Sequence, residues 1–283
     1  MTPPSPIRRL SEIAARYDAL LCDAWGVIHN GVSIFPGVEE ALSKFRATRG
    51  PVVILTNAPR PSEIIPPQLD RIGLARGAYD AVVTSGDATR EAIRGLLPGG
   101  AYKLGPDKDE KLYEGLGVRF APLDAADFIV CTGLVDDSHE TPGDYAGLLA
   151  RAAARRLPMI CANPDVVVRW GERLIYCAGA LAQSYERLGG EVVYGGKPHA
   201  PIYELAFRRL DEAAGRKIER RRVLAIGDGV STDIAGANRN GLDALFVAGE
   251  GGVHVGAADP ASIEAALAHA GVHAEFAATG LSW

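Results

Sequence analysis

Two carboxylates stand five positions apart in the segment GDGVSTD, residues 227–233, where a continuous apolar run meets a stretch with helical spacing. Gly227 and Gly229 permit a tight turn, so Asp228 and Asp233 can both face the end of the preceding strand. Carboxylate oxygens with open space for water are ligands that suit Mg²⁺. The same arrangement is typical of ordinary helix capping, and the segment alone leaves both interpretations open.

A third acid, Asp23, stands at the end of another apolar run, in the segment LLCDAWGVIHNG, residues 20–31. A carboxylate at a strand tip can act as a nucleophile on a phosphoryl group, or it can simply cap the strand. An acid that acts on a phosphoryl group would benefit from a second carboxylate two positions later. That position holds Trp25.

Two further segments offer groups that neutralise or bind an oxyanion. In GGKPHAPIY, residues 195–203, Lys197 precedes a proline where a Walker loop would have Ser or Thr, and the glycine spacing also differs. This lysine is either solvated or, beside several acids, neutralises a phosphoryl oxygen. Thr56 ends the apolar run of VVILTNAPR. Its hydroxyl and the following backbone N–H groups suit a tetrahedral oxyanion, and helix capping is the alternative.

Six continuous apolar runs of strand length predict the elements that position these residues. They are ALLCDAW (19–25), VVILTNA (52–58), AVVTSG (81–86), FIVCTG (128–133), PMICANPD (158–165) and RVLAIGDG (222–229). Helical spacing lies between them, for example at residues 37–50 and 200–216. Strands that alternate with helices predict an α/β fold with a parallel sheet, right-handed crossovers and helices on both faces.

Four of the predicted strands run directly into a polar cluster: Asp23, Thr56–Asn57, Asn163–Asp165 and Asp228–Asp233. In an open α/β sheet, ligands bind beyond the carboxyl ends of the strands. We therefore expect all four clusters at one edge of the sheet. That edge is the predicted site.

The positions of these clusters also predict how the chain divides into domains. Two clusters precede residue 82, one follows residue 187, and the residues between carry their own strand–helix pattern. We expect a discontinuous core domain at 1–81 and 188–283 and a cap domain at 82–187. An insertion of this size forms a domain of its own and covers the site.

Composition excludes several classes of protein. The formal net charge of −5 provides no basic field of the kind that attracts nucleic acid. No apolar run approaches the roughly 20 residues of a membrane span, and the start has no apolar core of the signal-peptide kind. We therefore expect a cytoplasmic protein with no membrane or nucleic-acid partner. The four cysteines lie far apart without Cys-x-x-Cys spacing, which predicts buried thiols rather than zinc ligands or disulfides.

Taken in order, five segments resemble the haloacid dehalogenase superfamily, and in particular its subclass IIA of NagD-like and p-nitrophenylphosphatase-like hydrolases. They are CDAWGVIHNG, ILTNAPR, CANPD, GGKPHAPIY and IGDGVSTDIAGANRNGLDALFVAGEG, and the resemblance spans about residues 17–250. It implies a Rossmann-like core with a parallel sheet and an inserted α/β cap of type C2. It also implies a Mg²⁺-dependent phosphatase of a small phosphorylated metabolite, with a homodimer through the cap as one form of assembly.

The resemblance further implies roles for individual residues in the core. Asp23 would be the nucleophile that forms an aspartyl-phosphate, and Thr56, Asn57 and Lys197 would hold the transferring phosphoryl group. Phosphoryl transfer needs positioning and charge neutralisation more than proton chemistry, so these groups suffice for the first step.

The remaining motif positions are implied to bind metal or shape the site. Asp228 would bind Mg²⁺ together with Asp23 and the backbone carbonyl of Trp25, while Asp233 would be a further ligand or an acid just behind one. Asn163 and Asp165 match a cap signature of the subclass and are candidates for shaping the substrate site.

Trp25 departs from the family pattern, in which a second Asp protonates the leaving oxygen and then activates water. An indole cannot exchange a proton near neutral pH, and general acid–base help is typically worth roughly 10²–10⁴ in rate, so we expect slow turnover. His29, six residues after Asp23, is a candidate substitute for this second Asp. Alternatively it is a residue of the flap, the loop that follows the nucleophile. Two alternatives stay open. One is a weakly active or inactive protein that binds a phosphate ligand and has a regulatory role. The other is a dehalogenase, which the complete pair of metal-binding acids disfavours.

Overall fold

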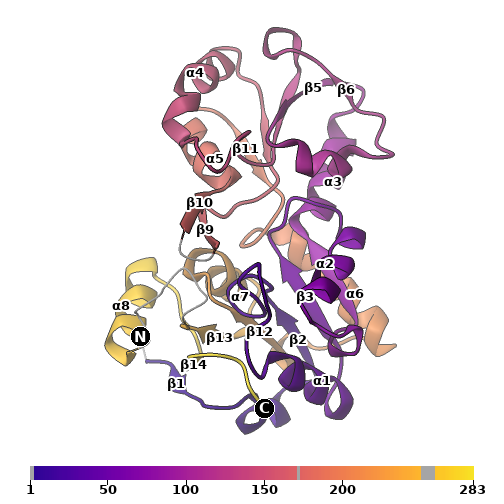
Figure 1. Cartoon of the computed structure of the whole chain (residues 1–283), viewed down its shortest axis with the longest axis vertical. Coiled ribbons are helices and arrows are strands. Elements are labelled where there is room, and N and C mark those ends of the chain that lie inside the picture. Colours follow the sequence, from indigo (N-terminus) through magenta and orange to yellow (C-terminus); the bar gives the residue numbers. More distant parts are fainter. Residues whose placement is uncertain (1–2, 171–172, 250–258) are drawn as a thin grey trace.

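The computed structural model describes residues 3–170, 173–249 and 259–283. Figure 1 shows two lobes, each built around its own parallel sheet. The lower lobe holds both ends of the described chain, since β1 and β14 are neighbours in its sheet. We call the lower lobe the core and the upper lobe the cap.

Over the described residues, the core sheet contains seven strands, and every neighbouring pair is parallel. Their order across the sheet is β1 (Ser5–Pro6), β14 (Phe276–Ala278), β13 (Asp243–Val247), β12 (Val223–Gly227), β2 (Ala19–Cys22), β3 (Val52–Thr56) and β4 (Ala81–Thr84). In the register of the central strands, Cys22 lies between Ile54 and Ile226. The carboxyl ends of β2, β3 and β12 are therefore adjacent.

Helices cover both faces of this sheet, which explains why its strands are apolar throughout rather than alternating. On one face Leu20 and Cys22 pack in a cluster with residues of α1 (Val38–Thr48) and α2 (Pro66–Arg71). On the other face Ala19 and Leu21 pack in a cluster with residues of α6 (Ala200–Ala214), α7 (Ala235–Arg239) and α8 (Pro260–Ala270). The predicted parallel sheet and its helical layers are confirmed.

The cap contains a five-stranded parallel sheet. Its order is β11 (Val192–Tyr194), β8 (Met159–Cys161), β7 (Phe128–Cys131), β5 (Gly100–Leu104) and β6 (Arg119–Phe120). Helices α4 (Ala146–Ala154) and α5 (Ala178–Arg187) contribute to the cluster on one face, and α3 (Ser85–Leu96) contributes to the cluster on the other. All six predicted strands are present, four in the core and two in the cap.

The chain enters the cap after β4 and returns to the core after β11. The boundaries expected at 81 and 187 fall at the start of β4 and at the last residue of α5. A two-stranded antiparallel hairpin, β9 (Val167–Trp170) with β10 (Arg173–Tyr176), lies between the lobes (Figure 1). It follows β8 and brings cap residues to the carboxyl edge of the core sheet.

The other short helical turns connect these elements. They are η1 (Leu10–Glu12), η2 (Ala14–Arg16), η3 (Ser62–Ile64), η4 (Arg76–Ala78), η5 (Asp107–Tyr113), η6 (Leu123–Ala125), η7 (Pro142–Tyr145), η8 (Arg220–Arg222) and the π-helical turn η9 (Val230–Ile234).

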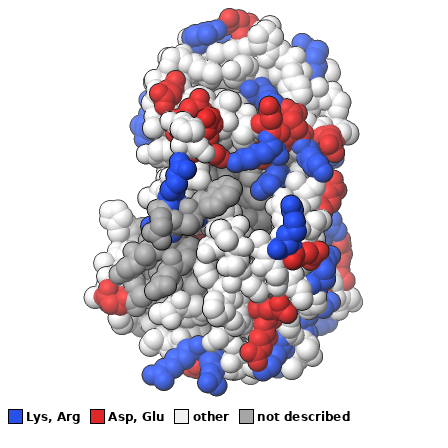
Figure 2. Space-filling view, in the orientation of Figure 1, with Lys and Arg blue, Asp and Glu red and all other residues white. Residues whose placement is uncertain are grey.

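The four cysteines are buried and free, as predicted. Acidic and basic side chains are interspersed on the face shown in Figure 2. Over the described part of the chain, no helix combines the length and apolar character that a bilayer crossing requires.

One expectation about the sheet edge is wrong. Asp23, Thr56 and Asp228 do follow adjacent core strands, but Asn163 and Asp165 follow β8, which belongs to the cap sheet. The reason is that β8 lies inside the inserted segment. Asp165 nevertheless reaches the core, because its Oδ1 accepts a hydrogen bond of 2.9 Å from Nδ2 of Asn57. The site is therefore built between the two sheets rather than at the edge of one.

Candidate active site

Asp23 is held at the tip of β2 by the backbone of its neighbours. Its N–H donates to the carbonyl of Ile226 over 2.8 Å, which extends the pairing of β2 with β12 by one residue. The Oδ1 atom accepts a hydrogen bond of 2.7 Å from the N–H of Ala24. The residue is 8% exposed and lines a cavity of about 310 Å³. A carboxylate in this position is fixed and faces space for a ligand.

Lys197 is a cation of the cluster, and the structure places it beside the acids. The residue is only 2% exposed, and its Nζ lies 2.7 Å from Oδ1 of Asp23 and 2.7 Å from Oδ1 of Asp233. Its backbone N–H donates to Oδ1 of Asn57 over 2.7 Å. Burial opposes the charged form, yet the acids Asp23, Asp233 and Asp165 together raise the pKa of Lys197 well above its usual range. The solvated alternative is therefore excluded.

Three carboxylates converge beside this lysine. One oxygen from each of Asp23, Asp228 and Asp233 lies within 4.8 Å of the others, and all three residues are buried. Asp233 lies in the π-helical turn η9 and its Oδ2 accepts a hydrogen bond of 3.0 Å from the N–H of Gly229. Asp233 thus contacts both the turn backbone and Lys197, so it does more than cap the turn.

Glycine is required where the backbone passes these acids. Gly26 has a φ of +84°, and a Cβ there would lie 2.4 Å from Oδ2 of Asp228. A Cβ at Gly227 would lie 2.2 Å from Cγ of Asp233. Any larger residue at either position would displace a carboxylate from the cluster.

The charges of the cluster do not balance. Burial, and then the charge of Asp23, raise the pKa of Asp233 to about 7. Burial also raises the pKa of Asp23, although Lys197 opposes this effect. Three buried acids facing one ammonium group leave a negative excess, and hard oxygen donors at this spacing suit Mg²⁺. The donor set therefore fits a magnesium ion.

Thr56 and Asn57 lie beside the cluster at the end of β3. The Thr56 hydroxyl accepts a hydrogen bond of 3.3 Å from the N–H of Ala58, and the side chain lines the same cavity as Asp23. Asn57 Nδ2 donates to Oδ1 of Asp165 and, over 3.3 Å, to the carbonyl of Lys197. Asn57 thus connects the phosphate-binding candidates of the core with the cap.

Trp25 has a role that the sequence did not reveal. Its Nε1–H donates over 2.7 Å to the backbone carbonyl of Arg169 in β9. A Cβ on Gly31 would lie 2.5 Å from the edge of the indole, so glycine is needed where this ring packs. The indole N–H is therefore engaged by the hairpin of the cap. No side-chain signal in the sequence could have identified this partner, because the acceptor is a main-chain oxygen.

His29 does not lie with the carboxylates. Its ring packs edge-on against Trp25 at 5.2 Å, and its Nδ1 accepts a hydrogen bond of 3.0 Å from the N–H of Gly31. It lines a further cavity of about 120 Å³, which Trp25 and Thr56 also border and whose lining includes none of the three acids. Burial lowers the pKa of His29 to about 4, so the imidazole is neutral and accepts from the backbone. This geometry supports the flap interpretation.

Acid should destabilise the protein through His29. Because burial lowers the pKa of this imidazole from its ordinary value of 6.5 to about 4, the unfolded chain binds the proton first as pH falls. The free energy of unfolding therefore has its full value above pH 6.5. It falls by up to about 3 kcal/mol as the pH is lowered from 6.5 to 4. Urea unfolding at pH 7 and pH 4.5 measures this, and the loss should be smaller in His29→Asn. Equal losses in both proteins would contradict the assignment.

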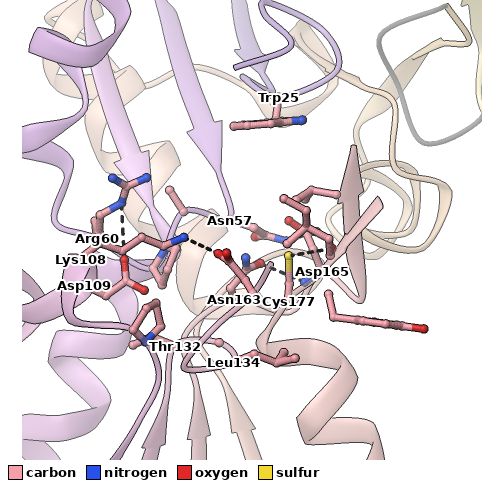
Figure 3. Close-up of a pocket in the computed structure, with 18 of the residues that line it drawn as sticks. Trp25, Asn57, Arg60, Lys108, Asp109, Thr132, Leu134, Asn163, Asp165 and Cys177 are labelled. Carbon is pink, nitrogen blue, oxygen red and sulfur yellow. Dashed lines mark hydrogen bonds and ion pairs between the residues drawn. The ribbon is translucent and has the colours of Figure 1, made fainter. Parts of the chain in front are cut away.

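An adjoining cavity of about 160 Å³ borders the cavity at Asp23 on the side of the cap. Trp25, Thr56, Asn57 and Asp165 line both cavities, and Asn163 lines only the adjoining one. In Figure 3, Trp25 lies on the opposite side of this space from Thr132 and Leu134. The Asn163 side chain accepts a hydrogen bond of 3.1 Å from the N–H of Asp165, so it orients that acid.

Four charged residues of the adjoining cavity were not predicted from the sequence: Arg60, Lys108, Asp109 and Asp137. Arg60 is the last residue of the segment ILTNAPR, which also contains Thr56. Its position shortly after a predicted strand of the site could have identified it as a candidate site residue. Lys108 and Asp109 belong to a run of charges, residues 107–111, which is typical of a solvated surface segment.

Comparison with known proteins agrees with the motifs. The model of the haloacid dehalogenase-like hydrolase family matches residues 20–119, and a HAD-hydrolase-like model matches residues 194–268. A solved structure of a hydrolase of the haloacid dehalogenase-like family from Brucella suis 1330 is 42% identical, with a TM-score of 0.89. The alignment covers 97% of this chain and 99% of that one.

Two curated relatives are more distant. D-glycerol 3-phosphate phosphatase of Mycobacterium tuberculosis is 27% identical over 243 residues, which are 84% of this chain and 65% of that protein. The chain thus spans somewhat less than two thirds of the length of this relative. Ribonucleotide monophosphatase NagD of Escherichia coli K12 is 27% identical over 233 residues, which are 81% of this chain and 86% of that protein.

Proposed function

The chain belongs to the haloacid dehalogenase-like hydrolase family, in its NagD-like subclass IIA, and on this premise we propose that it is a Mg²⁺-dependent phosphohydrolase of a small phosphorylated metabolite. The observation that carries the proposal is the contact of Asp23 with Lys197 beside two further buried acids, all facing a cavity of about 310 Å³. Such a site offers one nucleophile and positive charge for a phosphoryl group.

In the first step, a carboxylate oxygen of Asp23 attacks phosphorus, and the bond from phosphorus to the leaving oxygen breaks. Asp23 becomes an aspartyl-phosphate, and the alcohol takes its proton from water. Lys197 and the Thr56 hydroxyl neutralise and orient the phosphoryl oxygens. In the second step, water attacks the phosphorus of the aspartyl-phosphate, which releases inorganic phosphate and restores Asp23.

A magnesium ion would be held by Asp23, Asp228 and the carbonyl of Trp25, with Asp233 as a further ligand or just behind one. When bound, it supplies positive charge that lowers the repulsion between the nucleophile and the phosphoryl oxygens. Asn57 positions Lys197 through two hydrogen bonds to its backbone. Asp165, held by Asn57 and Asn163, closes the site from the cap.

Both steps proceed without an acid or base at position 25. The indole N–H of Trp25 is bonded to the carbonyl of Arg169, and His29 lines another cavity. We therefore propose slow turnover, most of all for esters whose leaving oxygen must be protonated. A cytoplasmic location, which the composition favours, and a homodimer through the cap, which the family resemblance implies, belong to the same proposal.

Trp25 also favours a second candidate, a protein that binds a phosphate ligand without hydrolysing it. The dehalogenase alternative is weaker, because the metal-binding pair Asp228 and Asp233 has little use in that reaction. The two leading candidates differ in a measurable way. Retained Mg²⁺-linked binding of vanadate together with undetectable hydrolysis would favour the binding protein.

Hydrolysis of p-nitrophenyl phosphate tests the proposal and its dependence on metal. We expect slow turnover with Mg²⁺ that chelation by EDTA abolishes and that added Mg²⁺ restores, since the buried acids then lack a counter-charge. Asp228→Asn should weaken the response to Mg²⁺, and Asp70→Asn, which alters an exposed acid, should not. Turnover that is insensitive to EDTA would contradict the proposal.

A further inference from the structure

The adjoining cavity contains buried charges that the phosphoryl chemistry does not use. It adjoins the phosphoryl site, since Thr56 and Asn57 line both spaces. A phosphate monoester bound at Asp23 would therefore extend its alcohol portion into this cavity. Arg60 and Asp109 lie on its walls, Arg60 after β3 of the core and Asp109 in η5 of the cap (Figure 3).

The contact between these two residues is incomplete. Arg60 Nε lies 3.7 Å from Oδ1 of Asp109, which is within reach of charge attraction but too long for a hydrogen bond. The Asp109 side chain is only 3% exposed. Both atoms are buried, and neither has a hydrogen-bond partner within the described ranges of the chain. Solvent does not reach these two atoms in this conformation, so a ligand hydroxyl bonds to them when the side chains turn toward the cavity. Leaving a buried polar atom without a partner costs roughly 1–3 kcal/mol, and a bound group that serves both atoms would remove this cost.

The charges around this pair restrict the chemistry of such a group. The cavity walls carry the cations Arg60 and Lys108 and the acids Asp109, Asp137 and Asp165. Lys108 already pairs with Asp137. A carboxylate or a second phosphate would meet Asp109 and Asp165, and an ammonium group would meet Arg60. A neutral hydroxyl avoids both repulsions, because it donates to the carboxylate and accepts from the guanidinium.

We infer that Arg60 and Asp109 bind a hydroxyl of the leaving group, so that the enzyme prefers phosphate monoesters of polyols or sugars to those of unsubstituted alcohols. This inference rests on the proposed function and specifies its substrate class. Arg60 and Asp109 determine specificity and do not touch the reacting atoms. Because they come from the core and the cap, the hydroxyl also connects the two lobes.

Paired substrates test the inference, and the comparison with the variants below separates recognition of the hydroxyl from the higher reactivity that a neighbouring hydroxyl gives the leaving oxygen. Glycerol 3-phosphate is compared with n-propyl phosphate, and ribitol 5-phosphate with n-pentyl phosphate, which have the same carbon chains without the remote hydroxyls. One hydrogen bond to a charged group corresponds to a preference of roughly 10- to 100-fold in kcat/KM. We expect the wild-type protein to show it in at least one pair, mainly through KM.

Variants then assign the preference to the two residues. In Asp109→Asn and in Arg60→Gln the preference should fall by about tenfold or more relative to the wild-type protein. Asp124→Asn is the matched control, since it removes an exposed acid of the cap that pairs with Arg151 outside both cavities. It should keep the wild-type preference, which separates recognition of the hydroxyl from a general effect of charge in the cap.

Two results would overturn the inference: equal kcat/KM within both substrate pairs in the wild-type protein, or a preference that survives in both variants. Failure of the proposed function looks different. In that case the wild-type protein hydrolyses none of the four esters and also fails to hydrolyse p-nitrophenyl phosphate, whose aryl group does not depend on Arg60 or Asp109.

Discussion

Replacing Asp23 by Asn should reduce hydrolysis of p-nitrophenyl phosphate by on the order of 10⁴-fold or more, because a carboxamide is a poor nucleophile and no other group replaces it. The substitution conserves shape. Asn can still accept the hydrogen bond from the N–H of Ala24, and Lys197 keeps its contact with Asp233. The variant should therefore fold, which thermal unfolding monitored by circular dichroism can verify.

Asp70→Asn provides the control for this variant, since Asp70 is an exposed acid of α2 in the same lobe. It should hydrolyse the substrate at the wild-type rate. If Asp23→Asn were folded and as active as this control, another group would be the nucleophile. The roles of Lys197 and Thr56 would then need to be reassigned with it.

Introducing the absent acid at position 25 should have the second largest effect, in the opposite direction. Trp25→Asp places a carboxylate two residues after the nucleophile, and general acid–base help is worth roughly 10²–10⁴ in rate. The substitution also removes the hydrogen bond to Arg169 and an aromatic wall of the cavities. The wild-type protein is therefore the wrong reference for this comparison.

Trp25→Asn is the matched reference, because it removes the same ring and the same hydrogen bond but supplies no titratable group. We expect Trp25→Asp to turn over p-nitrophenyl phosphate roughly 10² faster than Trp25→Asn under steady-state conditions. Equal rates in the two variants would show that the site cannot use an acid at this position. The slow turnover of the wild-type protein would then need another cause.

Much of the core was predictable because its signals are local. Strands buried on both faces are continuous apolar runs, and β2, β3 and β12 all lie within such runs. Asp23, Thr56 and Asp228 follow those strands directly, so the parallel order of the sheet was enough to bring them together. Lys197 was placed by its position before α6, and its contacts with two acids confirm the grouping.

The contacts between core and cap could not be read from local patterns. Asp165 was expected at the same sheet edge as Asp23, yet β8 pairs with cap strands, and Asp165 contacts the core through Asn57. Arg60 and Asp109 are far apart in sequence and meet only because the cap is placed over the core. Trp25 is the clearest case. The presence of Trp at this position showed that the second Asp of the family pattern is missing. Its contact with Arg169, however, depends on how the hairpin β9–β10 is placed.

The absence of an acid or base at position 25 should make the second step of the reaction the slow one. p-Nitrophenolate needs little protonation as it leaves, so formation of the aspartyl-phosphate should be fast even without an acid there. Hydrolysis of the aspartyl-phosphate requires an activated water, and position 25 supplies no base. The aspartyl-phosphate should therefore accumulate during turnover.

Rapid mixing of the protein with p-nitrophenyl phosphate and Mg²⁺ tests this order of rates most directly. We predict a burst of p-nitrophenolate equal to the number of active sites, then a slow steady phase, with phosphate recovered on the peptide that contains Asp23 after acid quenching. Linear release from the first turnover, with no covalent phosphate on that peptide, would contradict the proposed mechanism.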